Sequence, residues 1–171
     1  MAAKALDAAG CTDANGDGIR DYKGKPIRLR LLARTQSPGE QRAANLLAGW
    51  FKNIGIDVKL SVVDDGIFLD RIYNVNAAGD YAPDFDMLLF WTGRGPDPGM
   101  TLPCETSRRI GYWGVSSWGG KRYDDLWNAQ STTIDREARE AIVWEMQKSM
   151  PAGSFSGPAC CVSGLSSTAR R

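Results

Sequence analysis

The chain has 171 residues, of which 43% are hydrophobic and 24% charged, enough for one globular domain with a core. Its 21 basic and 20 acidic residues leave a formal net charge of +1, so no global field exists to attract nucleic acid or an anionic membrane. The absence of histidine excludes Ser-His and Cys-His nucleophile pairs and mixed Cys/His zinc sites. We therefore expect no nucleic-acid partner and no catalysis of these kinds.

The first signals along the chain are those of a short helix and a strand. Residues 2–9 are rich in alanine, and Gly10 is a natural stop for a helix over them. A polar loop follows over residues 13–18. Residues 27–32 alternate between apolar and basic side chains, which predicts a strand.

A helix over residues 38–54 is predicted by its start and by its periodicity. Ser37 and Glu40 form a capping box around a proline at the first helical position. Apolar side chains then recur at helical spacing, which predicts one stripe that packs on a sheet. The stripe consists of Ala43, Leu46, Leu47, Trp50 and Ile54.

Further strands complete the predicted sheet. Residues 56–62 alternate with period two directly after this helix, so we expect them to pair in parallel with residues 27–32 through a right-handed crossover. A shorter helix is predicted from Asp64 to about Tyr73. The nearly continuous apolar run Phe85–Trp91 predicts a strand buried on both faces.

The second half of the chain predicts a long loop, two helices and a tail. Residues 92–122 are rich in glycine and proline, and a loop of this length inside a domain is usually functional. Helices are predicted over residues 123–132 and from Asp135 to Met150. Residues 151–171 have no periodicity and few large apolar side chains, so we expect a disordered or frame-shifted tail.

The loop that begins at Asp13 matches the first half of the calcium-loop pattern D-x-[DN]-x-[DN]-G. The candidate ligands are Asp13, Asn15, Asp17, the carbonyl of Ile19, and Asp21 through water. Gly24 stands where the pattern has a bidentate glutamate, so we expect any calcium to bind weakly, in the sub-millimolar to millimolar class. Asx turns without a metal are the alternative explanation.

The segment that follows the apolar strand is the candidate solute site. Open α/β sheets place ligands where buried strands end, and Trp91, Arg94 and Asp97 lie at that point. An arginine can pair with a carboxylate bidentately, and an aspartate can pair with an amine. Trp113, farther along the loop, can stack on a ligand. The alternatives are a Pro/Gly turn with solvated charges and a tryptophan that only covers apolar surface.

Pairs of carboxylates are the candidates for acid–base catalysis. They are Asp64 with Asp65, Asp84 with Asp86, and Asp124 with Asp125. The first and third pairs fall near helix starts, where an aspartate complements the helix dipole and needs no catalytic role. A hydrolase that uses such a pair is a third hypothesis, and we expect no enzyme activity.

Several segments, in their order, resemble the extracellular solute-binding proteins of family 5 that serve ABC importers. The matching stretches are AKALDAAGCTDANGDGIRDYKGKPIRLRLLAR, SPGEQRAANLLAGWFKNIGIDVKLSVVDD, YAPDFDMLLFW with PDPG after it, and YDDLWNAQSTTIDREAREAIVWEMQK. The resemblance covers residues 1 to about 148. It implies an α/β fold in which residues 1–150 are part of the carboxy-terminal lobe of a type II periplasmic-binding-protein fold, with a mixed sheet and flanking helices.

The resemblance also implies a function. We expect the substrate-binding component, as a fragment, of an ABC importer for peptides or related small solutes, with a membrane permease as partner. No cofactor is required, and calcium is optional. Full-length members are periplasmic or extracellular, whereas this sequence starts without the apolar segment of a signal peptide. The alternative is a small calcium-stabilised interaction domain without small-solute binding.

Overall fold

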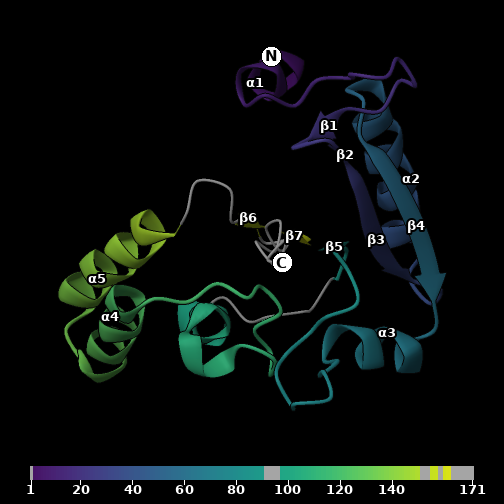
Figure 1. Ribbon diagram of the computed structural model, residues 1–171. Coiled ribbons are helices and arrows are strands. Elements are labelled where there is room, and N and C mark those ends of the chain that lie inside the picture. The colour runs from purple at the N-terminus through teal and green to yellow at the C-terminus, as the bar shows by residue number, and fades with distance from the viewer. Residues whose placement is uncertain (1, 91–96, 151–154, 158–159, 163–171) are drawn as a thin grey trace. The chain divides into compact units, whose positions relative to one another are not determined.

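The computed structural model describes residues 2–90, 97–150, 155–157 and 160–162. The chain divides into two compact units, residues 1–68 with 85–90 and residues 69–84 with 91–171. Figure 1 shows the helices and strands of both units, coloured along the chain. Within the described ranges, no helix has both the length and the apolar character that crossing a membrane requires.

A parallel sheet of three strands, in the order β4-β3-β5, forms the centre of the first unit. The strands are β3 (Arg28–Arg34), β4 (Asp57–Val63) and β5 (Met87–Leu88). β3 and β4 pair along their whole length, which confirms the predicted parallel pair. β5 is shorter than the predicted strand over 85–91, although Phe85 and Leu89 on either side of it are also buried. The described main sheet is therefore parallel throughout, and its central strand β3 is buried from Leu31 to Ala33.

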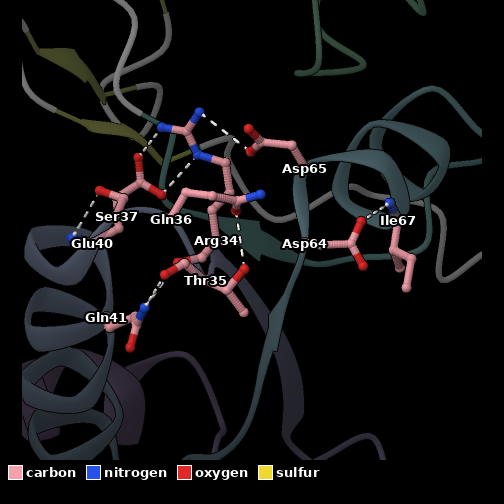
Figure 2. Close-up of polar contacts among 9 residues, drawn as sticks. All are labelled: Arg34, Thr35, Gln36, Ser37, Glu40, Gln41, Asp64, Asp65 and Ile67. Carbon is pink, nitrogen blue, oxygen red and sulfur yellow. Dashed lines mark hydrogen bonds and ion pairs between the residues drawn. The ribbon is translucent and has the colours of Figure 1, made fainter.

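The helix between these strands, α2 (Pro38–Asn53), begins as predicted but presents a different face. The Ser37 hydroxyl accepts a hydrogen bond from the backbone N–H of Glu40 and caps the helix (Figure 2). Leu46 and Trp50 are 58% and 62% exposed, so the prediction that they pack on the sheet is wrong. The buried side instead includes Ala44 and Glu40. Counting only apolar residues missed this side, because Glu40 is buried through an ion pair rather than through hydrophobic contact.

Two small elements precede the sheet. They are α1 (Ala2–Ala8) and a hairpin of β1 (Asp21–Tyr22) with β2 (Lys25–Pro26). Lys23 and Gly24, the two residues of the hairpin turn, both have positive φ, at 51° and 74°. This is the pattern of a type I′ turn, which matches the twist of its strands. The hairpin carries the chain from the polar loop into β3.

The second unit is built on two helices that pack against each other, α4 (Lys121–Thr132) and α5 (Arg136–Ser149). Its buried core is Leu102, Tyr123 and Met146. The side chain of Asp135 accepts a hydrogen bond from the backbone N–H of Ala138 at 2.8 Å, which confirms the predicted cap of α5. Three short 3₁₀ helices precede α4: η1 (Pro98–Met100), η2 (Leu102–Glu105) and η3 (Ser107–Arg109). The described part of the predicted long loop thus contains three short helical turns between residues 98 and 109.

The remaining elements are a helix and two strands. α3 (Asp65–Ile72) follows Asp64, whose carboxylate accepts a hydrogen bond from the Ile67 backbone N–H at 3.0 Å. β6 (Phe155–Gly157) and β7 (Cys160–Val162) form an antiparallel pair. Most of the predicted tail over 151–171 lies outside the described residues, so its assignment and the domain boundary at 150 stay predictions.

Candidate functional site

The candidate calcium loop is closed by hydrogen bonds among its own residues. The two carboxylate oxygens of Asp13 accept from the backbone N–H groups of Gly16 at 2.8 Å and Gly18 at 2.9 Å. The carboxylate of Asp17 accepts from the backbone N–H of Ile19 at 2.8 Å, and the side chain of Asn15 accepts from the backbone N–H of Asp17 at 3.0 Å. These contacts form a run of Asx turns.

The last candidate ligand, Asp21, lies at the base of this loop. Its carboxylate accepts a hydrogen bond from the backbone N–H of Ala14 at 3.3 Å. In the part of the chain that the structure describes, no group of three or more His, Cys, Asp or Glu side chains is arranged to hold a metal ion. The oxygen-rich composition still suits calcium rather than a softer metal. Calcium binding therefore stays a prediction.

Arg20 anchors this loop, and the sequence analysis missed it. Its Nε donates to the carbonyl oxygen of Ile54 at 2.7 Å, and its Nη1 donates to the carbonyl oxygen of Cys11 and to Asp7 Oδ1, both at 2.5 Å. Only 16% of its side chain is exposed. One guanidinium thus joins α1, the loop and the end of α2, and an isolated arginine in a polar loop gives no sequence signal of such contacts.

A charged cluster occupies the carboxyl end of the sheet, where parallel α/β folds place their ligands (Figure 2). Arg34, the last residue of β3, donates from Nε to Glu40 Oε2 at 3.0 Å and makes a second, shorter contact with the other carboxylate oxygen. Its Nη1 lies 3.7 Å from Asp65 Oδ1. Glu40 is 7% exposed. Hydrogen bonding to Glu40 raises the pKa of Arg34, so the guanidinium stays charged.

Arg34 also packs against two aromatic rings. Its guanidinium carbon is 4.7 Å from the ring centre of Phe90 and 5.7 Å from that of Phe68. The two rings lie 5.3 Å apart. The contact fixes the side chain of Phe90, the last described residue before the candidate solute segment. Sequence reasoning missed the arrangement because it treated Glu40 only as part of a helix cap.

The structure describes two of the four predicted solute residues, Asp97 and Trp113. Trp91 and Arg94 lie outside the described residues. Asp97 is exposed and makes a bidentate pair with Arg139 of α5, with N···O distances of 3.0 and 3.3 Å. The hydrogen bonds from Arg139 lower the pKa of Asp97. Trp113 is half-exposed at a positive φ of 67°. The structure therefore shows Asp97 held by an arginine of its own unit.

A concavity of about 360 Å³ lies wholly within the second unit. Its lining contains two arginines, two aromatic rings and three smaller polar side chains. The lining residues are Pro103, Thr106, Arg108, Arg109, Tyr112, Asp124, Trp127 and Asn128. Its volume is in the range of small-molecule sites. The sequence points to Trp113 in this region but gives no signal for the residues that form the hollow, because they share no motif or period.

A protein-family model matches about the first two thirds of the chain. The model described as bacterial extracellular solute-binding proteins, family 5 Middle, matches residues 1–107. A curated relative, the periplasmic murein peptide-binding protein MppA of Escherichia coli (strain K12), is 29% identical over 118 residues. That match covers 68% of this chain and 20% of the relative, so the chain spans about a fifth of the relative's length.

Solved structures show the same fold. The oligopeptide-binding protein AppA from Bacillus subtilis, in complex with a nonapeptide, matches with a TM-score of 0.70 and 23% identity over 85% of this chain and 28% of that chain. A periplasmic oligopeptide-binding protein from Thermotoga maritima, bound to mannohexaose, matches with a TM-score of 0.72 and 22% identity over 86% of this chain and 28% of that chain. Both are type II periplasmic binding proteins, which confirms the predicted fold class. The chain therefore belongs to the bacterial extracellular solute-binding proteins of family 5.

Proposed function

We propose that this chain acts in the substrate-binding component of an ABC importer for peptides or related small solutes, and that it binds its ligand without transforming it. The family match over residues 1–107 carries this proposal. The Escherichia coli relative is a murein peptide-binding protein, which supports peptides as the first ligand class to test. A membrane permease as partner and a periplasmic location belong to the same proposal.

The arrangement of the first unit supports a ligand at the carboxyl end of the sheet. β3 and β4 run in parallel and end at Arg34 and Val63, and β5 pairs in parallel with the other side of β3. In open α/β sheets, this edge is where ligands bind. We assign solute contacts to Trp91, Arg94, Asp97 and Trp113 within this proposal. Asp97 would act through its pair with Arg139 or exchange that partner for a ligand amine.

Peptide titration of the ¹⁵N-labelled full chain tests this function. We expect saturable shifts with tri- to pentapeptides, weaker binding in Arg94→Ala, and unchanged binding in the control Arg42→Ala, an exposed arginine on α2. Mass spectrometry should recover the peptides intact. Cleaved peptides would favour the hydrolase hypothesis instead. Failure of every peptide and sugar, with a strong effect of calcium on stability, would favour the interaction domain.

A further inference from the structure

We propose that the hollow of the second unit binds a small carboxylate carried on a flat apolar body, such as an aromatic acid. This inference does not rest on the solute-binding role, because none of the proposed solute residues that the structure describes lines the hollow. All residues that line it belong to the second unit. It concerns residues 103–128, most of which lie beyond the segment that the family model matches.

The charge of the lining favours a monoanion. Arg108 and Arg109 contribute two cations against the single carboxylate of Asp124. Among the described residues, the Arg108 side chain makes no ion pair with a carboxylate, and the guanidinium carbon of Arg109 lies 5.5 Å from the ring centre of Tyr112. A cation–π contact uses none of the five N–H donors of a guanidinium, so these remain available to an acceptor. The net charge of the lining is thus +1, which one carboxylate neutralises and a dianion such as phosphate exceeds.

The walls of the hollow suit a flat ring. Asp124, Trp127 and Asn128 lie three and four residues apart, so they share one face of α4. Trp127 on this face and the largely exposed Tyr112 supply aromatic surface. The Asn128 side chain offers both a donor and an acceptor beside them. An apolar ring between the aromatic residues would leave its carboxylate near the two arginines.

Hydrogen bonds and close packing hold these walls in place without a ligand. The backbone N–H of Ser107 donates to Asp124 Oδ1 at 2.9 Å, which ties η3 to α4. The hydroxyl of the buried Tyr123 donates to the carbonyl oxygen of Leu102 at 2.9 Å, which ties η2 to the same helix. A site formed before binding loses less entropy when it is occupied.

The turn that carries Tyr112 is equally constrained. The backbone N–H of Gly114 donates to the carbonyl oxygen of Arg109 at 2.8 Å. A Cβ atom on Gly114 would lie 2.7 Å from that oxygen and 2.5 Å from the carbonyl oxygen of Cys104. Only glycine therefore fits at this position, and the turn fixes the backbone from Arg109 to Gly114, which includes Tyr112.

Titration of the full chain with benzoate, benzamide and inorganic phosphate tests the proposal. Benzoate should shift the indole signal of Trp127 and the amide signals of residues 106–112 in a saturable way. Benzamide, which has the same shape without charge, and phosphate, which has charge without a ring, should each bind at least about tenfold more weakly. Equal shifts with benzoate and benzamide, or tighter binding of phosphate, would overturn the proposal.

Single substitutions test whether each of the two arginines contributes to benzoate binding. Arg109→Ala and Arg108→Ala should each weaken benzoate binding about tenfold, and Arg109→Lys should restore only part of it, because lysine lacks the guanidinium fork. Arg42→Ala, on the first unit, is the charge-matched control and should leave affinity unchanged. Circular dichroism checks that each variant is folded. Unchanged affinity in folded Arg108→Ala and Arg109→Ala proteins would rule out the assigned role, whatever peptides bind elsewhere.

Discussion

The guanidinium of Arg20 donates to the carbonyl oxygen of Ile54, 34 positions later in the chain, at 2.7 Å. The backbone makes a second link in the same direction, since the N–H of Arg20 donates to the carbonyl oxygen of Gly55, also at 2.7 Å. Carbonyls at the end of a helix have no partner within the helix, and Arg20 supplies one. The polar loop and α2 are therefore joined at one residue.

Replacing Arg20 by alanine should destabilise the protein by about 2 kcal/mol, because two carbonyl oxygens and one carboxylate lose a largely buried donor. Urea unfolding measures this change. Arg28→Ala is the matched control, since its pair with Asp57 is exposed on both sides, and it should cost about 0.5 kcal/mol or less. Equal losses in the two variants would contradict an anchoring role for Arg20.

Glu40→Gln should cost about 3 kcal/mol, because it leaves the largely buried guanidinium of Arg34 without its main counter-charge. A double-mutant cycle with Arg34→Met separates pair energy from local packing. In the cycle, the double variant should recover part of the loss. The exposed pair of Lys121 with Asp125 is the control, and Asp125→Asn should change the free energy of unfolding by less than about 0.5 kcal/mol.

The ion pair of Asp97 with Arg139 should make the stability of the fold depend on pH. Its hydrogen bonds hold the pKa of Asp97 below the unfolded value of about 4. Stability from the pair is therefore fully present above about pH 4 and is lost as the pH falls through the folded-state pKa. Thermal unfolding from pH 7 to pH 2 should show a smaller acid-induced fall in Tm for Asp97→Asn than for the unchanged protein, with Asp70→Asn on α3 as control.

The exposure of Trp50 on α2 predicts that its removal has little effect on stability. Trp50→Ala should change the free energy of unfolding by about 0.5 kcal/mol or less, because the side chain is 62% exposed. Leu31→Ala, at a side chain that is 1% exposed, should cost about 3 kcal/mol. A large loss in Trp50→Ala would restore the original prediction that this side chain packs on the sheet.

Calcium should raise the Tm of the chain only at millimolar concentration, because the loop at Asp13 lacks a bidentate glutamate. Unfolding scans with EGTA and with ~10 mM calcium measure the effect. Asp17→Asn should reduce it, and magnesium at the same concentration is the control. Saturation at micromolar calcium would contradict a weak site, and no effect in the unchanged protein would leave the Asx turns as the full explanation.

Elements with short-range signals could be predicted from the sequence. The caps at Ser37 and Asp135 lie within a few residues of the N–H groups that they bind, so the starts of α2 and α5 followed directly. The alternating runs that became β3 and β4 also carry their pattern locally. Parallel pairing followed from the helix between them.

Features that depend on distant residues could not be predicted in the same way. The side of α2 that packs depends on the contact of Glu40 with Arg34, which no count of apolar residues includes. The hollow depends on Ser107 reaching Asp124 and on the close approach of Gly114 to Cys104. Neither relation leaves a period or motif in the sequence. The assignment of Trp91, Arg94, Asp97 and Trp113 to a solute site stays a prediction.

The hairpin turn at Lys23 and Gly24 limits how the neighbouring loop can change. Gly24 occupies the twelfth position of the calcium pattern, counted from Asp13, and its φ of 74° belongs to the left-handed region. A glutamate introduced there to complete the coordination sphere would strain the turn that aligns β1 with β2. Tighter ion binding and an intact hairpin are therefore competing demands on one backbone position. A protein engineer who seeks a calcium-responsive variant would have to extend the loop before β1 rather than substitute Gly24.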